Sequence, residues 1–340
     1  MIALRPNVDT WLYPAEAGLY CEPGDFYIDP HRAVPRAVIT HGHSDHARSG
    51  HGAVLATRET IEIMKVRNGP DAAGRYEPLP FGQPVSINGV RVRLAPAGHI
   101  LGSAQIVIEW AGRRAVISGD YKRTSDPTCA SFEVVPCDLF VTEATFALPV
   151  FRHEKAENEV EKLLASLAAE PHRTHLVGAY NLGKCQRMIR IIRNAGYVEP
   201  IHLHGAVTAL TELYRSFGVE FGELRPVAEA DAGTLPGGIV ICPPSALSDP
   251  WSRRFADPVR TLASGWMRVR RRARQLGIEL PLVVSDHADW MELIQTIVET
   301  GAEEIWVTHG REDALVHYLS SIGRRARALA LVGRRDEEGE

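Results

Sequence analysis

Short apolar runs separated by glycine and proline dominate the first 145 residues of the chain. Six of these runs have the length and the β-branched content that are typical of buried or half-buried strands. They read FYIDP, RAVIT, VRVRLAP, AQIVIEW, RRAVISGD and DLFVTEA. The pattern predicts that the first part of the chain is built mainly from β-strands.

After Thr145 the pattern changes to helices that alternate with strands. The segment HEKAENEVEKLLASLAAE has the apolar spacing of an amphipathic helix with a charged outer face. Later elements are predicted as strand THLVGAY, helix GKCQRMIRIIRNAG, strands GGIVICPP and PLVVSDH, helix WMELIQTIVETG, strand EIWVTHG and a last helix near residues 313–324. Such alternation predicts a layered α/β architecture.

Composition adds limits to this picture. The 340 residues carry a net charge of −4 and are 45% hydrophobic, which is typical of a globular protein without a global signature of polyanion binding. The five cysteines show no CxxC spacing, so we expect reduced thiols and a cytoplasmic protein. The N-terminal stretch lacks the pattern of a signal peptide, and no apolar run approaches the ~20 residues that span a bilayer. We therefore expect no membrane partner.

Ligand-type side chains follow several apolar runs at the point where each predicted strand ends. One such residue is more often a turn or hydrogen-bonded structural group, but six of them suggest a shared location, since ligands bind at the carboxyl ends of strands in open α/β sheets. The six are His41, His99, Asp120, Glu143, His287 and His309.

The stretch THGHSDH concentrates further donors just after the RAVIT run. His41 and His43 lie two apart and point the same way in an extended segment, while Asp45 and His46 follow as the chain turns. Imidazole and carboxylate donors suit Zn²⁺ or Mn²⁺, and a centre with two ions needs about seven donors with one bridging carboxylate. The predicted ligands are His41, His43 and His99 for one ion, Asp45, His46 and His309 for the other, and Asp120 as the bridge.

These motifs resemble those of a known family. THGHSDH, PAGHILGSA, SGDY and VTHG are similar to the metal-binding motifs of the metallo-β-lactamase fold, and VTEATF and SDHADW narrow the resemblance to the β-CASP nucleases. GLYCEPGDFYIDP, SGDYKRTSDPTCA and ASGWM resemble most the bacterial DNA ligase-associated exonucleases. The resemblance implies an αββα metallo-β-lactamase sandwich formed by residues 1–150 and 280–340, with an α/β β-CASP cap domain inserted at 151–279.

The resemblance also implies a metal-dependent phosphodiester hydrolase. We expect Asp45, His287 and Glu143 to be the catalytic residues, with His287 as the general acid that protonates the departing alkoxide and Glu143 as the group that keeps it protonated. The alternatives are that Glu143 caps a helix or loop and that His287 is a metal ligand. By family analogy, Asp29 in YIDP braces the metal-binding loop without being a ligand.

A substrate site is predicted in VGAYNLGKCQRMIRI, where a strand turns into a helix that begins near Lys184. A helix N-terminus can hold a phosphate, and a similar segment of the Artemis-like β-CASP nucleases contributes to a pocket for a terminal 5′-phosphate. We predict Lys184, Tyr180 and Lys122 as substrate-binding residues of a 5′→3′ DNA exonuclease. The alternative is a routine strand-to-helix turn with a solvated lysine.

The segment RVRRRARQ places five arginines within seven positions, residues 268–274. A solvated helix face is the favoured interpretation, and a surface that binds a nucleic-acid backbone is the alternative. The expected partner is DNA, as a single strand or a duplex end, and the family resemblance adds a DNA ligase and helicase repair proteins.

Other functions remain open at this point. An RNA-processing β-CASP enzyme and a small-molecule metallo-hydrolase, such as a thioester or lactone hydrolase, use the same metal motifs. The inserted cap and the SDHAD and VTHG motifs count against the small-molecule enzyme. A redox di-iron protein would place Glu where the chain has Ser44, and a catalytically dead scaffold would lack ligands that are all present here. Only the resemblance favours DNA over RNA.

Overall fold

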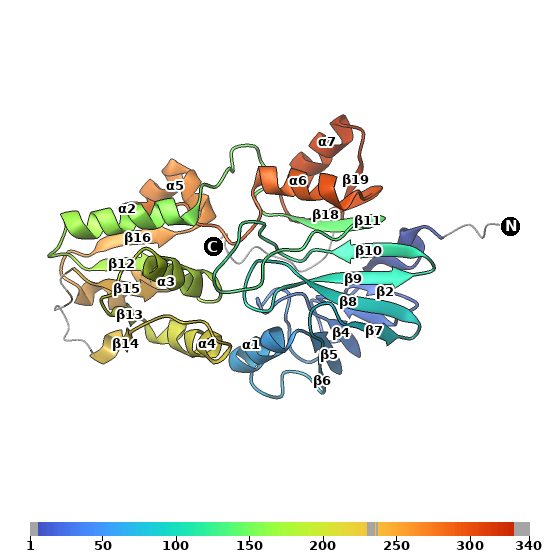
Figure 1. Ribbon diagram of the computed structural model, residues 1–340, viewed down its shortest axis with the longest axis horizontal. Coiled ribbons are helices and arrows are strands. Elements are labelled where there is room, and N and C mark those ends of the chain that lie inside the picture. The colour runs from blue at the N-terminus through green and yellow to red at the C-terminus, as the bar shows by residue number, and fades with distance from the viewer. Residues whose placement is uncertain (1–5, 230–234, 236, 330–340) are drawn as a thin grey trace. The chain divides into compact units, whose positions relative to one another are not determined.

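The computed structural model describes residues 6–229, 235 and 237–329. The chain forms two compact units: unit 1 comprises Met1–Arg152 with His287–Glu340, and unit 2 comprises His153–Asp286. Each unit combines sheets with helices (Figure 1), so the predicted α/β class is confirmed.

Unit 1 contains a six-stranded sheet in the order β1-β2-β3-β4-β5-β6. The first three strands pair antiparallel, and β3 to β6 pair parallel. The strands are β1 Leu12–Ala15, β2 Gly18–Cys21, β3 Phe26–Ile28, β4 Arg36–Val38, β5 Ala53–Ala56 and β6 Tyr76–Pro78. The predicted strands FYIDP and RAVIT are β3 and β4.

A seven-stranded sheet completes unit 1, in the order β19-β18-β11-β10-β9-β8-β7. Strands β7 to β10 pair antiparallel, and β10, β11, β18 and β19 pair parallel. The strands are β7 Pro84–Ile87, β8 Val90–Pro96, β9 Ala104–Trp110, β10 Arg113–Ile117, β11 Leu139–Ala144, β18 Glu304–Gly310 and β19 Arg325–Ala328. Four of the predicted early strands are β8 to β11.

The two sheets of unit 1 share one apolar core. Ile28 and Val38 from the first sheet and Ile106 and Val141 from the second belong to the same buried cluster. Alternation in β8 shows why, because every second residue from Val90 is buried while the arginines between them point away. The facing sheets set the ends of several strands at one edge of unit 1.

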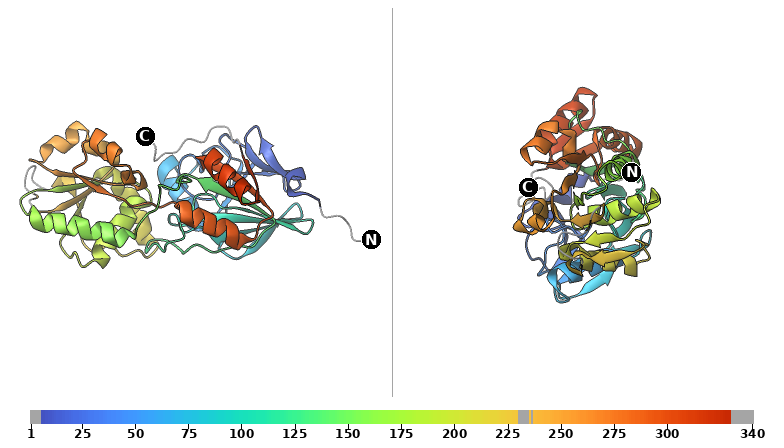
Figure 2. Two further views of the ribbon diagram at one scale, coloured as in Figure 1. Left: turned by 90° about the horizontal axis from the view of Figure 1, so that it is seen from above. Right: turned by 90° about the vertical axis from the view of Figure 1, so that its left-hand side faces the viewer.

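Helices cover the outer faces of both sheets. Helices α6 and α7 pack over the seven-stranded sheet through a second buried cluster that contains Phe140, Leu293 and Leu315, and Figure 2 shows both helices over one face of that sheet. Helix α1 packs on the six-stranded sheet through Ile61 and Met64. The helices are α1 Arg58–Asn68, α6 Trp290–Thr300 and α7 Glu312–Ser321.

Unit 2 is built on one all-parallel sheet in the order β14-β13-β15-β12-β16-β17. Helices α2, α3 and α4 are neighbours, and α5 contributes Ala273 to the buried cluster on Leu176 and Val240. The strands are β12 His175–Gly178, β13 Ile201–Leu203, β14 Leu224–Pro226, β15 Ile239–Cys242, β16 Val259–Ala263 and β17 Leu280–Leu282. The helices are α2 Ala156–Ala169, α3 Lys184–Asn194, α4 Gly205–Ser216 and α5 Arg270–Gln275.

One predicted strand is shorter than its sequence pattern suggests. The PLVVSDH segment forms only β17, which ends at Leu282, because the backbone N–H of Val283 donates to the Glu159 carboxylate instead of continuing the ladder. His287 therefore lies in the loop that leads to α6 and does not directly follow a strand.

Two further observations concern the whole described chain. None of its helices is both long enough and apolar enough to cross a bilayer. All five cysteines are free thiols, and Cys21, Cys185 and Cys242 are buried.

We predict that Ile106→Ala destabilises unit 1 by about 2–5 kcal/mol, because it leaves a cavity between the two sheets. Urea unfolding followed by tryptophan fluorescence measures this change. Val198→Ala is the matched control, since the Val198 side chain is 80% exposed and should change stability by less than about 0.5 kcal/mol. Equal effects of the two substitutions would contradict the shared core.

Candidate metal centre

Helix α1 holds the histidine-rich loop that follows β4. Gly42 separates His41 from His43, and a Cβ at Gly42 would collide with the side chain of Ile63 in α1. The Arg67 guanidinium, one helical turn further on, donates to the Gly42 carbonyl at 2.7 Å. Only glycine allows the loop to lie this close to the helix.

Asp29 links the start of the same loop to one of its histidines. Its Oδ1 accepts from the Thr40 N–H at 2.8 Å, and its Oδ2 accepts from the Thr40 hydroxyl at 2.6 Å. The same Oδ2 lies 2.7 Å from His46 Nδ1. These contacts orient the His46 ring so that Nε2 is its remaining donor atom, which is the arrangement expected of a bracing carboxylate. The bracing role itself stays a prediction.

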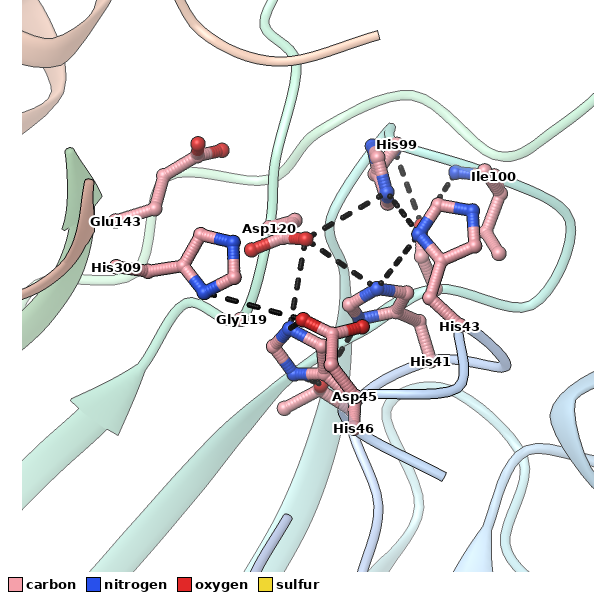
Figure 3. A network of polar contacts seen from close by, with 12 residues as sticks. His41, His43, Asp45, His46, His99, Ile100, Gly119, Asp120, Glu143 and His309 are labelled. Carbon is pink, nitrogen blue, oxygen red and sulfur yellow. Dashed lines mark hydrogen bonds and ion pairs between the residues drawn. The ribbon is translucent and has the colours of Figure 1, made fainter. Parts of the chain in front are cut away.

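Four predicted ligands form a first buried donor group (Figure 3). His43 Nδ1 lies 3.1 Å from both His41 Nε2 and His99 Nε2. Asp120 Oδ2 lies 3.4 Å from His41 Nε2 and 3.8 Å from His99 Nε2. All four donor atoms lie within 4.8 Å of one another.

A second donor group joins Asp45, His46 and His309. Asp45 Oδ2 lies 3.3 Å from His46 Nε2 and 3.9 Å from His309 Nδ1. Asp120 Oδ2, which belongs to the first group, also lies 3.5 Å from His46 Nε2. One carboxylate oxygen thus contacts histidines of both groups, which is the position that a bridging ligand requires.

The loops after β8 and β10 have specific local requirements. Ser103 Oγ accepts from the N–H groups of His99 and Ile100, which fixes the turn that carries the His99 ring. Gly119 has φ +56°, and a Cβ there would come within 2.7 Å of the Thr40 side chain. The glycine before Asp120 therefore lets the β10 loop pack directly on the residue before His41.

The histidine pKa values shift in opposite directions in the two donor groups. Burial lowers the pKa of His41 to about 3, so its imidazole is neutral and can act as a ligand. Burial also acts to lower the pKa of His46, but the carboxylates of Asp45, Asp120 and Asp29 outweigh it and raise that pKa well above its ordinary value. For Asp45, burial acts to raise the pKa, and the positive charge of His46 more than offsets this. The carboxylates therefore favour positive charge at the centre.

Asp120 gives the clearest test of whether these residues fit metal ions. Its Oδ1 is buried and has no hydrogen-bond partner in the described part of the chain. A buried carboxylate oxygen without a partner is costly, and a bound cation satisfies it. The donor set of neutral imidazoles and carboxylates suits Zn²⁺ or Mn²⁺.

Glu143 and His287 form a pair beside the first donor group. His287 Nδ1 lies 2.9 Å from Glu143 Oε2, and the other oxygen of Glu143 accepts from the backbone N–H of Tyr121 at 2.8 Å. The Tyr121 carbonyl in turn accepts from the N–H of Ala288 at 2.6 Å. Since Asp120, Glu143 and His287 also lie close enough to hold an ion, the possibility that His287 is a ligand needs an experiment.

The predicted substrate residues are divided between the two units of the chain. Lys122, in unit 1, is almost completely buried, with its Nζ 2.5 Å from Glu292 Oε2. Lys184, in unit 2, is also buried, with its Nζ 3.5 Å from Asp286 Oδ2. The carbonyl of Tyr180 accepts from a backbone N–H in the first turn of α3. Their roles in substrate binding stay predictions.

Sequence reasoning missed Glu292, which ties the loop after Asp120 to helix α6. Its carboxylate accepts from Lys122 Nζ, from the N–H and hydroxyl of Thr124, and from the N–H of Asp289. Asp289 caps α6 reciprocally, so the two residues form a capping box. The spacing Asp-x-x-Glu in SDHADWME is the signal that could have revealed it.

Several known proteins are similar to this chain in sequence, although no family model matches it. The chain is 28% identical over 328 residues, 94% of its length, to a protein of Opitutus terrae named "Probable DNA ligase". It is 27% identical over 217 residues to "Cleavage and polyadenylation specificity factor subunit 3-I" of Arabidopsis thaliana and 28% identical over 228 residues to "Endoribonuclease YSH1" of Kluyveromyces lactis, in each case 54% of its length. The chain is therefore similar to β-CASP nucleases of the metallo-β-lactamase family.

The matches limit what the relatives' names imply for this chain. It spans only 31%, 31% and 29% of the lengths of those three relatives. A crystal structure of a protein of unknown function from Enterococcus faecalis aligns with a TM-score of 0.57 at 16% identity, covering 88% of this chain and 80% of that one. That likeness supports the fold alone.

We predict that the protein binds two divalent ions per chain and that Asp120→Ala loses both, because Asp120 Oδ2 contacts histidines of both donor groups. His41→Ala should lose only the ion of the first group. Native mass spectrometry and elemental analysis of protein purified without chelator measure the stoichiometry.

Asp313→Ala, a change of an exposed aspartate on α7, is the control and should keep both ions. A wild-type protein with fewer than two ions, or an Asp120→Ala variant that retains two, would show that the ligand assignment is wrong.

Proposed function

We propose that this chain is a metal-dependent nuclease that hydrolyses phosphodiester bonds of DNA. The observation that carries the proposal is the position of Asp120 Oδ2 between two histidine groups, with the Glu143–His287 pair beside them. Unit 1 is proposed to be the metallo-β-lactamase αββα sandwich and unit 2 the β-CASP cap. A cytoplasmic site of action is part of the proposal.

The residues divide the chemistry between them. The seven donors hold two Zn²⁺ or Mn²⁺ ions, which supply Lewis-acid stabilisation of phosphate charge and activation of the attacking water. Asp45 binds one ion and shapes the negative potential of the second group. His287 gives a proton from Nε2 to the departing alkoxide, because Glu143 occupies its Nδ1. Glu143 thereby fixes the ring orientation and stabilises the charged imidazolium.

The relatives favour DNA as the substrate. The protein named a DNA ligase matches 94% of the chain, whereas the matches named for polyadenylation and endoribonuclease activity reach 54%. Because the ligase relative is much longer than this chain, we propose that the nuclease works with a DNA ligase, and with helicase repair proteins, in end processing or repair. An RNA-cleaving enzyme is the second candidate, favoured by the endoribonuclease names.

Attack from the 5′ end is the finer part of the proposal. Helix α3 begins at Lys184 after Gly183, whose φ of +93° opens the turn that follows Tyr180. Lys184 and Arg187 both contact the carboxylate of Asp286. Positive charge at a helix N-terminus suits a terminal 5′-phosphate.

Purified protein incubated with Mn²⁺ or Zn²⁺ and with end-labelled single-stranded DNA, duplex DNA and RNA tests the function directly. We expect cleavage of DNA that EDTA abolishes, with faster loss of a 5′ label than of a 3′ label. Cleavage of RNA in preference to DNA would favour the second candidate. No cleavage of any of the three by protein with two bound ions would contradict a nuclease.

We predict that His287→Ala lowers turnover by about 10²–10⁴-fold while both ions remain bound, the usual scale for a lost general acid. Glu143→Gln should act in the same direction with a smaller effect. Single-turnover rates and elemental analysis separate the two quantities, and His317→Ala, at an exposed position of α7, is the control. If His287→Ala loses an ion, His287 is a ligand and the acid must be another group.

Lys184→Ala should erase the preference for a 5′-phosphate over a 5′-hydroxyl without changing metal content, since it removes one of the two cations beside Asp286. The measured quantity is the ratio of initial rates on the two oligonucleotides. Lys155→Ala, at the exposed N-cap of α2, is the control, and thermal melting checks that the buried site still folds. An unchanged ratio in a folded variant would show that Lys184 does not distinguish a 5′-phosphate from a 5′-hydroxyl.

A further inference from the structure

A cluster of positive charge lies on unit 2, in a segment that contributes none of the site residues assigned above. Residues 258–278 contain six arginines and no aspartate or glutamate, although the whole chain has a net charge of −4. Five of the arginines, which we call the arginine face, lie within seven positions. They are Arg268, Arg270, Arg271, Arg272 and Arg274.

The local structure turns these arginines outward. They belong to a single 3-10 turn, Gly265–Arg268, and to the short helix α5 between β16 and β17. Met267 and Ala273 point inward and are buried in the apolar cluster of unit 2. All the arginines of the face are exposed except Arg272, which is half-buried. Met267 and Ala273 therefore attach the segment to the core of unit 2, and the exposed arginines face the solvent.

The exposed arginines of the face have no carboxylate partner in the described part of the chain. Three other arginines of unit 2 do: Arg173 pairs with Glu279, and Arg215 and Arg225 pair with nearby glutamates. Like charges three or four residues apart on a helix repel each other and destabilise it. A segment that keeps such repulsion, with no nearby carboxylate to offset it, is typical of a functional surface.

An aromatic side chain adds to the chemistry of the face. The guanidinium of Arg272 lies 5.3 Å from the ring centroid of Trp266, which is half-buried at the edge of the face. Ser264 fixes this turn by accepting from the Trp266 N–H. Arginines beside an aromatic ring are the combination that binds single strands, because phosphates pair with guanidinium groups and bases stack on rings.

We propose that the arginine face binds the phosphate backbone of a nucleic-acid strand. The proposal rests on the nuclease function and deepens it, by naming a surface of unit 2 that holds the substrate. A nucleic acid fits better than an acidic protein because five cations within seven residues match the regular, dense charge of a phosphate backbone. The face contributes affinity without sequence preference.

The test measures binding in EDTA, so that no cleavage occurs. Affinity of a fluorescent single-stranded DNA of about 20 nucleotides is followed by anisotropy across a range of salt concentrations. The variant R270A/R271A/R274A should bind more weakly, and the slope of log K against log[salt] should fall in magnitude by about 2, because each lost phosphate contact removes about 0.7.

Two further variants make the result specific. R32A/R215A/R225A removes the same net charge from exposed arginines that pair with Glu16, Glu212 and Glu223, and its slope should stay within about 0.5 of the wild-type slope. R270K/R271K/R274K keeps the charge and should keep most of the slope. Circular dichroism and metal content verify that each variant is folded.

Three outcomes overturn the proposal: an equal loss in the control variant, an unchanged slope in the alanine variant, or a loss in the lysine variant as large as that in the alanine variant. Competition by polyglutamate as effective as competition by unlabelled oligonucleotide would also overturn it in favour of an acidic protein partner. Failure of the nuclease function appears separately, as wild-type protein that binds DNA through the face but does not cleave it when metal is restored.

Discussion

The Asp120 carboxylate is almost completely buried, and the candidate site depends on how its charge is balanced. One of its oxygens faces the histidines of both donor groups and the other has no hydrogen-bond partner in the described chain. Burying such a group is favourable only when a cation is present or when neighbouring groups carry protons. The structure meets this requirement through the raised pKa of His46, while His41 stays neutral and available as a ligand. Metal binding and the stability of unit 1 are therefore linked, because the same carboxylates serve both.

The supports around the centre come from elements that are distant in sequence. Helix α1 holds the Gly42 carbonyl through Arg67, Asp29 holds Thr40 and His46, and Glu292 holds the loop after Asp120. None of these supporting groups belongs to either donor group. Their common effect is to fix the loops before any ligand arrives, so that binding orders few additional groups and costs less conformational entropy.

The sequence predicted the chemistry of the site better than its supports. The donors of the THGHSDH stretch, with His99 and Asp120, could be proposed because ligand-type residues that follow apolar runs are easy to recognise in the sequence. The paired strands of the early chain were equally visible, since β8 and β9 have clear apolar runs. The contacts of Arg67 and Glu292 with these loops could not be predicted from spacing, because each loop lies more than 20 residues away in the sequence. The end of β17 was misplaced because a single hydrogen bond to Glu159 replaces the ladder that its apolar residues favour.

The peptide of Tyr121 couples two parts of the site that are usually considered separately. Its N–H holds Glu143, its carbonyl holds Ala288, and the residue before it is Asp120. His287, the proposed proton donor, is thereby attached, through two short hydrogen bonds, to the backbone that carries Asp120. The radius of the bound metal ion would then affect proton transfer. A larger cation that displaced Asp120 would also displace the imidazole, so substitution of one metal for another would change the alignment of the acid together with the Lewis acidity of the ion.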